Sequence, residues 1–180
     1  MATATRERLG VEHALLGLLR QRPMHAYEMY QRLSAVDALR LVWRLKQSHL
    51  YALLAKLEAD GLVTSSTETQ GTRPPRRMLR LTPAGEDTFA QWIVAPVRHG
   101  RDFRLEFLAK LYFATQVDAN ATRELLDQQR VACQDWIRDL ETQGAASDPE
   151  RPFERLIYQF RVTQIEAILR WLDTCEQALT

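Results

Sequence analysis

The sequence contains little cysteine and no long hydrophobic run. Its 180 residues include only Cys133 and Cys175, which lie far apart and show no metal-ligand spacing. We therefore expect reduced thiols and no disulfide framework. No segment approaches the roughly 18 consecutive apolar residues of a membrane span, and residues 1–10 do not have the apolar centre of a signal peptide. These absences predict a cytoplasmic protein that does not associate with membranes.

The sequence also shows none of the residue spacings that are typical of catalytic, metal or cofactor sites. The four histidines, His13, His25, His49 and His99, have no ligand spacing such as i, i+4, and no glycine-rich phosphate loop is present. Ser48 and His49 are adjacent, so on a helix they would face different sides and would not act as nucleophile and base. We therefore expect no enzyme activity, metal ion or cofactor.

The net charge is only +1, but the charges are unevenly distributed along the chain. Residues 1–95 contain 13 lysines and arginines and 9 acidic residues, whereas residues 96–180 contain 11 and 14. This asymmetry predicts that the N-terminal half meets a polyanion such as DNA, chance being the alternative explanation. Pro96 and Gly100 mark the boundary between the halves.

Hydrophobic periodicity predicts two helices at the start of the chain. Apolar residues recur at helical spacing from about residue 9 to 20, and again from about residue 25 to 38. Pro23 separates the two segments.

A third helix is expected to begin at Gln47 or Ser48, since the preceding Lys46 is a poor N-cap, and to end before Gly61. Its leucines at positions 50, 53, 54 and 57 form one buried stripe. The opposite face carries Ser48, Ala52, Ala55 and Ala59, with Tyr51 and Lys56 at its edges. A solvated helix face is usually rich in Glu, Lys and Gln, so this face of small residues indicates close approach to another surface.

Two extended runs, residues 62–68 and 76–81, flank a segment of turn residues and predict a β-hairpin. No acidic residue occurs from residue 69 to 85, whereas the tip and the return strand are rich in arginine. The arginines are Arg73, Arg76, Arg77 and Arg80. Thr82 as N-cap and Pro83 as first helical residue then open another helix.

The C-terminal half predicts long amphipathic helices with a loop at residues 144–152. The last helix has a near-heptad apolar pattern over roughly 27 residues, or ~40 Å. So long a helix cannot bury all its apolar surface in a small domain, so we expect it to pack against a second copy of the chain. The residues expected at this dimer interface are Phe107, Leu111, Trp136, Leu140, Phe160, Ile168, Trp171 and Cys175.

Three helices, a hairpin and a further helix follow the order of a winged helix-turn-helix. The expected fold is mainly α with a small β-hairpin wing: a winged helix-turn-helix DNA-binding domain (residues 1–95) and a C-terminal antiparallel helical dimerisation domain (residues 96–180). In this fold the third helix enters the major groove and the wing reaches the flanking phosphates. The expected DNA-binding residues are Tyr27, Gln47, Ser48, His49, Tyr51, Ala52, Lys56, Arg73, Arg76 and Arg77.

The same segments resemble the PadR-like family of regulators over nearly the whole chain. Residues 14–19 and 23–29 are similar to the first two helices of the family, with Ala26 where glycine is usual. Residues 50–63 resemble its recognition helix and the turn into the wing. Further similar segments are residues 71–77 and 81–85 in the wing and following helix, and residues 165–172 with Cys175 in the dimer arm of the longer subgroup.

The resemblance implies a homodimer that represses transcription, often of its own operon, and that a small molecule releases from DNA in many members. We therefore expect a sequence-specific DNA-binding regulator that binds a pseudo-palindromic operator, with double-stranded DNA, a second copy of itself and an effector as partners. The alternative is a winged-helix module for protein–protein interaction, which would have no need of an arginine-rich wing.

Overall fold

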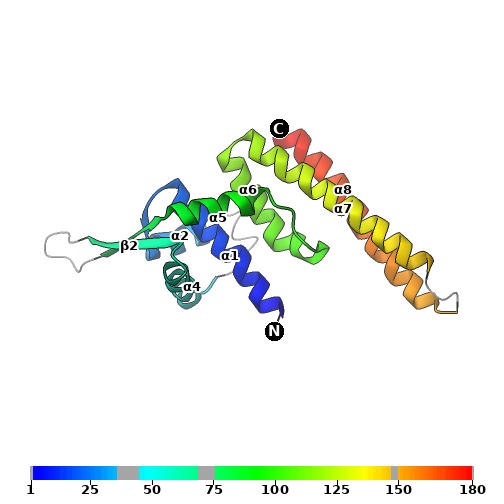
Figure 1. Ribbon diagram of the computed structural model, residues 1–180, viewed down its shortest axis with the longest axis horizontal. Coiled ribbons are helices and arrows are strands. Elements are labelled where there is room, and N and C mark those ends of the chain that lie inside the picture. The colour runs from blue at the N-terminus through cyan, green and yellow to red at the C-terminus, as the bar shows by residue number, and fades with distance from the viewer. Residues whose placement is uncertain (1, 36–44, 69–75, 147–149, 180) are drawn as a thin grey trace. The chain divides into compact units, whose positions relative to one another are not determined.

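The computed structural model describes residues 2–35, 45–68, 76–146 and 150–179 (Figure 1). The chain forms two compact units. The first comprises Met1–Ile93 together with Arg104–Phe113, and the second comprises Val94–Phe103 and Ala114–Thr180. The junction at Ile93 lies next to the domain boundary expected after residue 95.

The first unit contains helices around a small sheet. Its elements are α1 (Ala2–Gln21), β1 (Met24–His25), α2 (Ala26–Ala35), α4 (Gln47–Ala59), β2 (Val63–Glu68), β3 (Arg76–Leu81) and α5 (Pro83–Val94). The expected hairpin is therefore present, and it extends away from the helices of this unit (Figure 1). The helix predicted from about residue 9 begins earlier, at Ala2.

The sheet contains one strand that the sequence did not predict. β1 pairs antiparallel with β3, with Met24 opposite Leu79, and β3 pairs antiparallel with β2 in the order β1-β3-β2. The second helix consequently begins at Ala26 and not at His25, because residues 24 and 25 are extended and the Met24 side chain is fully buried. The predicted end of that helix near residue 38 lies outside the described residues.

Apolar stripes from the helices and one face of the sheet form the core of this unit. Gly17 of α1 lies so close to the rings of Phe113 and Phe89 that a Cβ atom there would come within 2.8 Å of both. The other buried members include Val11, Leu15, Leu18, Met24, Met29, Leu33, Leu50, Leu53, Leu54, Leu57, Val63, Leu79 and Ile93. The leucine stripe expected on α4 is thus confirmed as its buried face.

Two local signals that join α4, the wing and α5 act as expected. Gly61 ends α4 with φ of 71°, in the left-handed region that glycine tolerates best. The Thr82 hydroxyl accepts a hydrogen bond from the Gly85 amide at 3.1 Å and donates one to the Gly61 carbonyl at 2.8 Å. Thr82 therefore caps α5 and connects its start to the end of α4.

The second unit is dominated by two long helices, α7 (Ala119–Ala145) and α8 (Pro152–Leu179), which lie side by side (Figure 1). The Asp118 carboxylate caps α7 by accepting from the Ala121 amide at 2.7 Å. Arg130 of α7 bridges to Asp173 and Glu176 of α8. The mainly helical fold with a β-hairpin wing and a C-terminal helical hairpin is therefore confirmed.

The two cysteines are buried free thiols of this helical hairpin. Burial raises the pKa of the Cys133 and Cys175 thiols, which favours their protonated forms. Within the part of the chain that the structure describes, no helix has the length and hydrophobicity needed to cross a membrane.

A buried lysine connects α5 to the segment that returns to the first unit. That segment contains a π-helical turn (Phe103–Phe107) and the start of α6 (Leu108–Val117). Lys110 is 2% exposed; its ammonium donates to the Trp92 carbonyl, lies 4.8 Å from the centre of the Trp92 ring and lies 3.6 Å from the Glu106 carboxylate. Burial lowers the pKa of Lys110 from 10.5 to about 8.

Replacing this lysine by Lys110→Met should change how stability depends on pH. Because the pKa of Lys110 is lower in the folded chain, the unfolded chain binds more protons above about pH 8, and wild-type stability rises with pH there. Relative to the variant, the wild type should gain about 2 kcal/mol of unfolding free energy between pH 7 and about pH 9.5. Urea unfolding of both proteins at the two pH values measures this difference, and equal pH slopes would contradict it.

Candidate nucleic-acid interface

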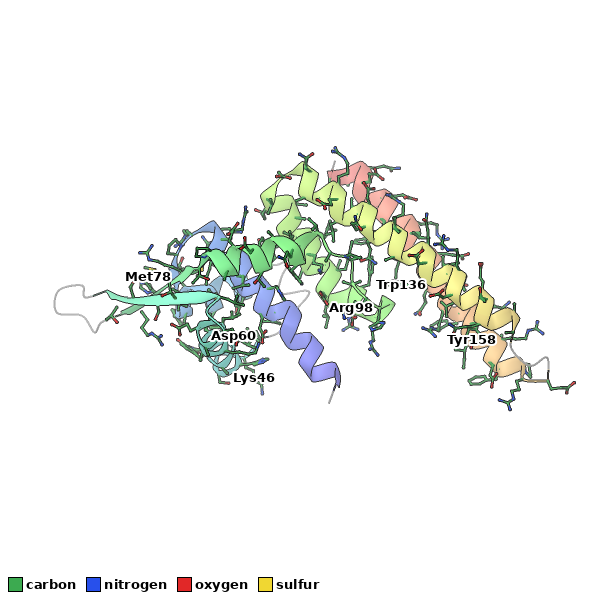
Figure 2. All side chains as sticks on the ribbon, in the orientation of Figure 1. Lys46, Asp60, Met78, Arg98, Trp136 and Tyr158 are labelled. Carbon is green, nitrogen blue, oxygen red and sulfur yellow. The ribbon has the colours of Figure 1, made fainter. Side chains whose placement is uncertain are left out.

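The exposed side of α4 is the expected face of small residues. Tyr51 is 47% exposed, and Ser48, Ala52, Ala55 and Ala59 are exposed as well. Lys46 and Asp60 mark the two ends of this helix (Figure 2). The four buried leucines hold the helix by its opposite side, so its backbone lies close to the surface with few long side chains over it.

The N-terminus of α4 resolves the two alternative starts in favour of Gln47. Lys46 occupies the N-cap position with extended backbone angles, φ −76° and ψ 144°. Its carbonyl accepts from the amides of His49 and Leu50, but its side chain makes no capping hydrogen bond to a described residue. Gln47 and Ser48 are exposed in the first turn, where a recognition helix meets base edges.

His49 does not belong to this exposed face. The residue is only half-exposed, and its Nε2 atom is buried without a hydrogen-bond partner among the described residues. On the helix His49 lies between the exposed face and the buried leucines, and its contact with bases stays a prediction.

Lys56, which was expected to contact DNA, is paired within the protein. Its ammonium lies 2.9 Å from the carboxylate of Glu12 on α1 and 3.2 Å from that of Asp60. The hydrogen bond to Glu12 raises the pKa of Lys56. The Glu12 carboxylate is buried, and the positive charge of Lys56 offsets the cost of removing that carboxylate from water. The ion pair therefore helps to hold α4 against α1.

The wing brings one described arginine into contact with the recognition helix. The Nη2 atom of Arg77 on β3 lies 2.7 and 2.9 Å from the two carboxylate oxygens of Glu58 and donates to the Ser65 hydroxyl at 2.8 Å. Arg76 is the first residue of β3, but its side chain lies outside the described part, as does the whole of Arg73.

Tyr27 adds an exposed aromatic residue on α2. Its side chain is 56% exposed. Tyr27 and Tyr51 are thus large polar-tipped residues on the two helices of the helix-turn-helix, and both keep the exposure that the expected DNA contacts need. No cluster of His, Cys, Asp and Glu side chains within the described residues could hold a metal ion.

The residues expected at a dimer interface fall into two classes. Phe107, Leu111, Leu140 and Cys175 are buried within the chain itself, so they leave almost no surface for a partner and are corrected to core residues. Trp136, Phe160, Ile168 and Trp171 retain exposed surface.

Further exposed apolar residues occupy the same face of α8 as Phe160. Phe153 is 73% exposed, and Leu156 and Ile157 are also exposed. These residues belong to the near-heptad stripe of the sequence. Their exposure follows only from the position of α7 against the opposite side of α8.

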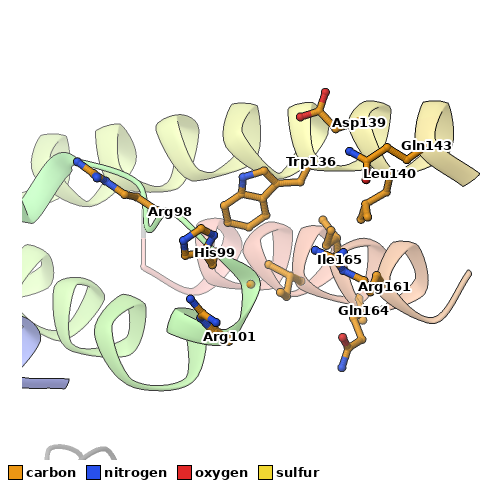
Figure 3. A pocket seen from close by; sticks show the side chains of 13 residues that line it. Arg98, His99, Arg101, Trp136, Asp139, Leu140, Gln143, Arg161, Gln164 and Ile165 are labelled. Carbon is orange, nitrogen blue, oxygen red and sulfur yellow. The ribbon is translucent and has the colours of Figure 1, made fainter. Parts of the chain in front are cut away.

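A cavity of about 790 Å³ lies within the second unit (Figure 3). Its floor includes Leu140, Ile165 and Ile168, and the Trp136 indole reaches into the space from α7. Four basic side chains, Arg98, His99, Arg101 and Arg161, line it against one carboxylate, that of Asp139. Of these, Arg98 and Arg161 form no ion pair with a residue in the described ranges. The cavity therefore combines an apolar floor with an excess of positive charge.

Comparisons with known proteins found matches for both halves of the chain. The model of the "Transcriptional regulator PadR-like family" matches residues 15–91, and that of "Virulence activator alpha C-term" matches residues 103–180. The chain is 28% identical over 131 residues to the negative transcriptional regulator PadR of Bacillus subtilis, covering 73% of this chain and 71% of that protein.

A second relative and a solved structure of the first one extend over almost the full length. A probable transcriptional regulator of Mycobacterium tuberculosis is 25% identical over 188 residues, covering 95% of this chain and 98% of that protein. The crystal structure of Bacillus subtilis PadR in complex with operator DNA is similar with a TM-score of 0.47 and 22% identity, covering 93% of this chain and 97% of that one. The two family models match separate halves of the sequence, and the chain is similar to transcriptional regulators of the PadR-like family over most of its length.

Proposed function

We propose that this regulator is a sequence-specific DNA-binding repressor that acts in the cytoplasm as a homodimer on a pseudo-palindromic operator. The observation that carries the proposal is the exposed small-residue face of α4 above a fully buried leucine stripe. Repression is the direction that the relative from Bacillus subtilis is named for, and we extend it to this chain.

The dimensions of α4 and of the major groove support base reading by this helix. The groove of B-DNA is wide enough for one α-helix, provided that long side chains do not hold it away. Ser48, Ala52 and Ala55 meet that condition, and Gln47 and Ser48 supply hydrogen-bonding groups at the N-terminal end. Tyr27 and Tyr51 are exposed on α2 and α4, and their contact with a phosphate or base of the DNA is part of the proposal.

A carboxylate at the centre of this face should abolish operator binding. Ala52→Glu places a negative charge where the helix would enter the groove, yet Ala52 is exposed and glutamate is a good helix former, so folding should be little affected. Binding to DNA from upstream of its own gene should weaken at least a hundredfold in an electrophoretic mobility-shift assay. The matched control is Ala90→Glu, which adds the same charge at an exposed position of α5. Wild-type affinity in folded Ala52→Glu would show that this face does not meet DNA.

The proposed dimer uses the apolar face of α8. Phe153, Leu156 and Phe160 are spaced by three and four residues, so they project from one side of the helix. Each is more than half exposed, and a contiguous exposed patch of this kind marks an interaction surface. A second copy of the chain offers the same patch, as a two-fold symmetric interface requires.

A charge within this patch should dissociate the dimer. Phe160 is 62% exposed, so Phe160→Glu removes little core packing but would bury an unpaired carboxylate in the interface. Light scattering should report a dimer for the wild type and a monomer for the variant at micromolar concentration. Gln159→Glu is the control, because residue 159 points about 100° away from residue 160 around the helix. A dimeric Phe160→Glu protein would exclude this face.

For the effector, we propose the cavity of the second unit and an organic anion with a planar ring. The Trp136 indole and the aliphatic floor fit the ring, and the arginines of the rim fit an acidic group. The same helices, α7 and α8, line the cavity and carry the proposed dimer face. Occupation of the cavity would therefore act on the elements that set the spacing of two DNA-binding units.

This ligand class is tested with 2-naphthoate as the probe and uncharged 2-naphthol as its neutral counterpart. Naphthoate should bind more tightly than naphthol. Arg98→Ala or Arg161→Ala should lower the affinity for naphthoate roughly tenfold, because one charge-assisted hydrogen bond is lost. Isothermal titration calorimetry measures these affinities. Arg138→Ala is the control, since Arg138 lies on α7 but pairs with Asp135 outside the cavity. Equal binding of the two probes would contradict an anion site.

A further inference from the structure

Residue 77 is the point at which the wing is attached to the rest of the first unit. The Arg77 guanidinium contacts Glu58 of α4 and Ser65 of β2 through its Nη2 atom. The Arg77 carbonyl accepts a hydrogen bond from Nδ1 of His25 at 2.9 Å. His25 belongs to β1 and directly precedes α2. One residue of β3 is thus connected to α4 and to the strand that directly precedes α2.

These contacts are placed where the hairpin leaves the body of the unit. Arg77 pairs with Thr67, next to the last registered pair of the hairpin, Glu68 and Arg76. A hairpin of two strands is held at its base by β1, which pairs with residues 78 and 79 but extends no further. In the described part of the hairpin, only the pair of Glu68 and Arg76 follows this position. The side-chain contacts of Arg77 are therefore well placed to influence the orientation of the wing.

The chemistry of the pair favours orientation over stability. Glu58 is partly buried, whereas Arg77 is largely exposed, and an ion pair of this kind contributes little to folding. All three contacts use Nη2, so the Nε and Nη1 groups of Arg77 donate to no described residue.

We propose that Glu58 is a positioning residue that fixes the wing at a set distance from the recognition helix through Arg77 and thereby contributes to operator specificity. The inference rests on the proposed DNA-binding function. A fixed wing meets phosphates only where α4 meets its correct bases, so the two contacts reinforce each other at the operator. A loosened wing binds phosphates on any sequence, and it loses that coupling.

Glu58→Gln tests the inference in the full-length protein. The variant keeps the side-chain shape but removes the charge that holds Arg77. Affinity for the upstream DNA, relative to unrelated DNA of equal length, should fall about tenfold. Affinity for the unrelated DNA should not fall, and its salt dependence should steepen by about one unit of slope, because the released arginine becomes free to neutralise one more phosphate. Fluorescence anisotropy over a range of salt concentrations measures both quantities.

Glu86→Gln is the matched control. Glu86 forms an exposed ion pair with Arg20 in the same unit, so this variant removes one negative charge without touching the wing. If both variants show the same ratio of operator to unrelated affinity, Glu58 does not position the wing. If the wild type itself does not distinguish the upstream DNA, the proposed function fails instead, so the two failures are distinguishable.

A second variant covers the case in which Glu58→Gln does not fold. Arg77→Lys keeps the positive charge on β3 but replaces the planar fork by a single ammonium on a flexible stem. The ratio of operator to unrelated affinity should again fall, because one ammonium cannot hold the Glu58 carboxylate and the Ser65 hydroxyl in the geometry that the guanidinium imposes. An unchanged ratio in folded Arg77→Lys overturns the inference.

Discussion

Burial of one side of α4 is the constraint on which the rest of the first unit depends. Leu50, Leu53, Leu54 and Leu57 remove that side from water, and each fully buried leucine contributes roughly 2 kcal/mol. Because a helix is rigid, fixing one face fixes the other, and the small residues opposite become the outermost surface. The proposed groove contact is therefore a consequence of core packing.

The charges around α4 follow from that packing. The helix sits against α1 and the wing, and its C-terminal half meets a buried carboxylate at Glu12 and a guanidinium at Arg77. Lys56 forms an ion pair with Glu12, and Glu58 forms one with Arg77. Both side chains therefore help to orient the helix. In the N-terminal half of α4, Gln47, Ser48 and Tyr51 are exposed to solvent.

In the second unit, the helices are long but only part of their apolar surface is buried within the unit. Two helices of 27 and 28 residues pack against each other and against the segment of residues 94–103. Part of the apolar stripe of α8 nevertheless remains exposed. One consequence is the exposed aromatic face of α8. Another is the cavity beside Trp136, where the segment with Arg98 and Arg101 adds charge to an apolar floor.

The sequence by itself determined the helices, the hairpin, the Gly61 stop, the Thr82 cap and the two faces of α4, because periodicity and turn chemistry depend on near neighbours. Only the tertiary structure decided the partners of Lys56 and Arg77, the burial of the His49 Nε2 atom and the β1 strand. It also separated buried Phe107 and Leu140 from exposed Phe160, although all three are apolar residues of helical stripes. Glu12 and Lys56 are 44 residues apart, and such a pairing depends on how the helices pack against each other, which no local pattern of residues encodes.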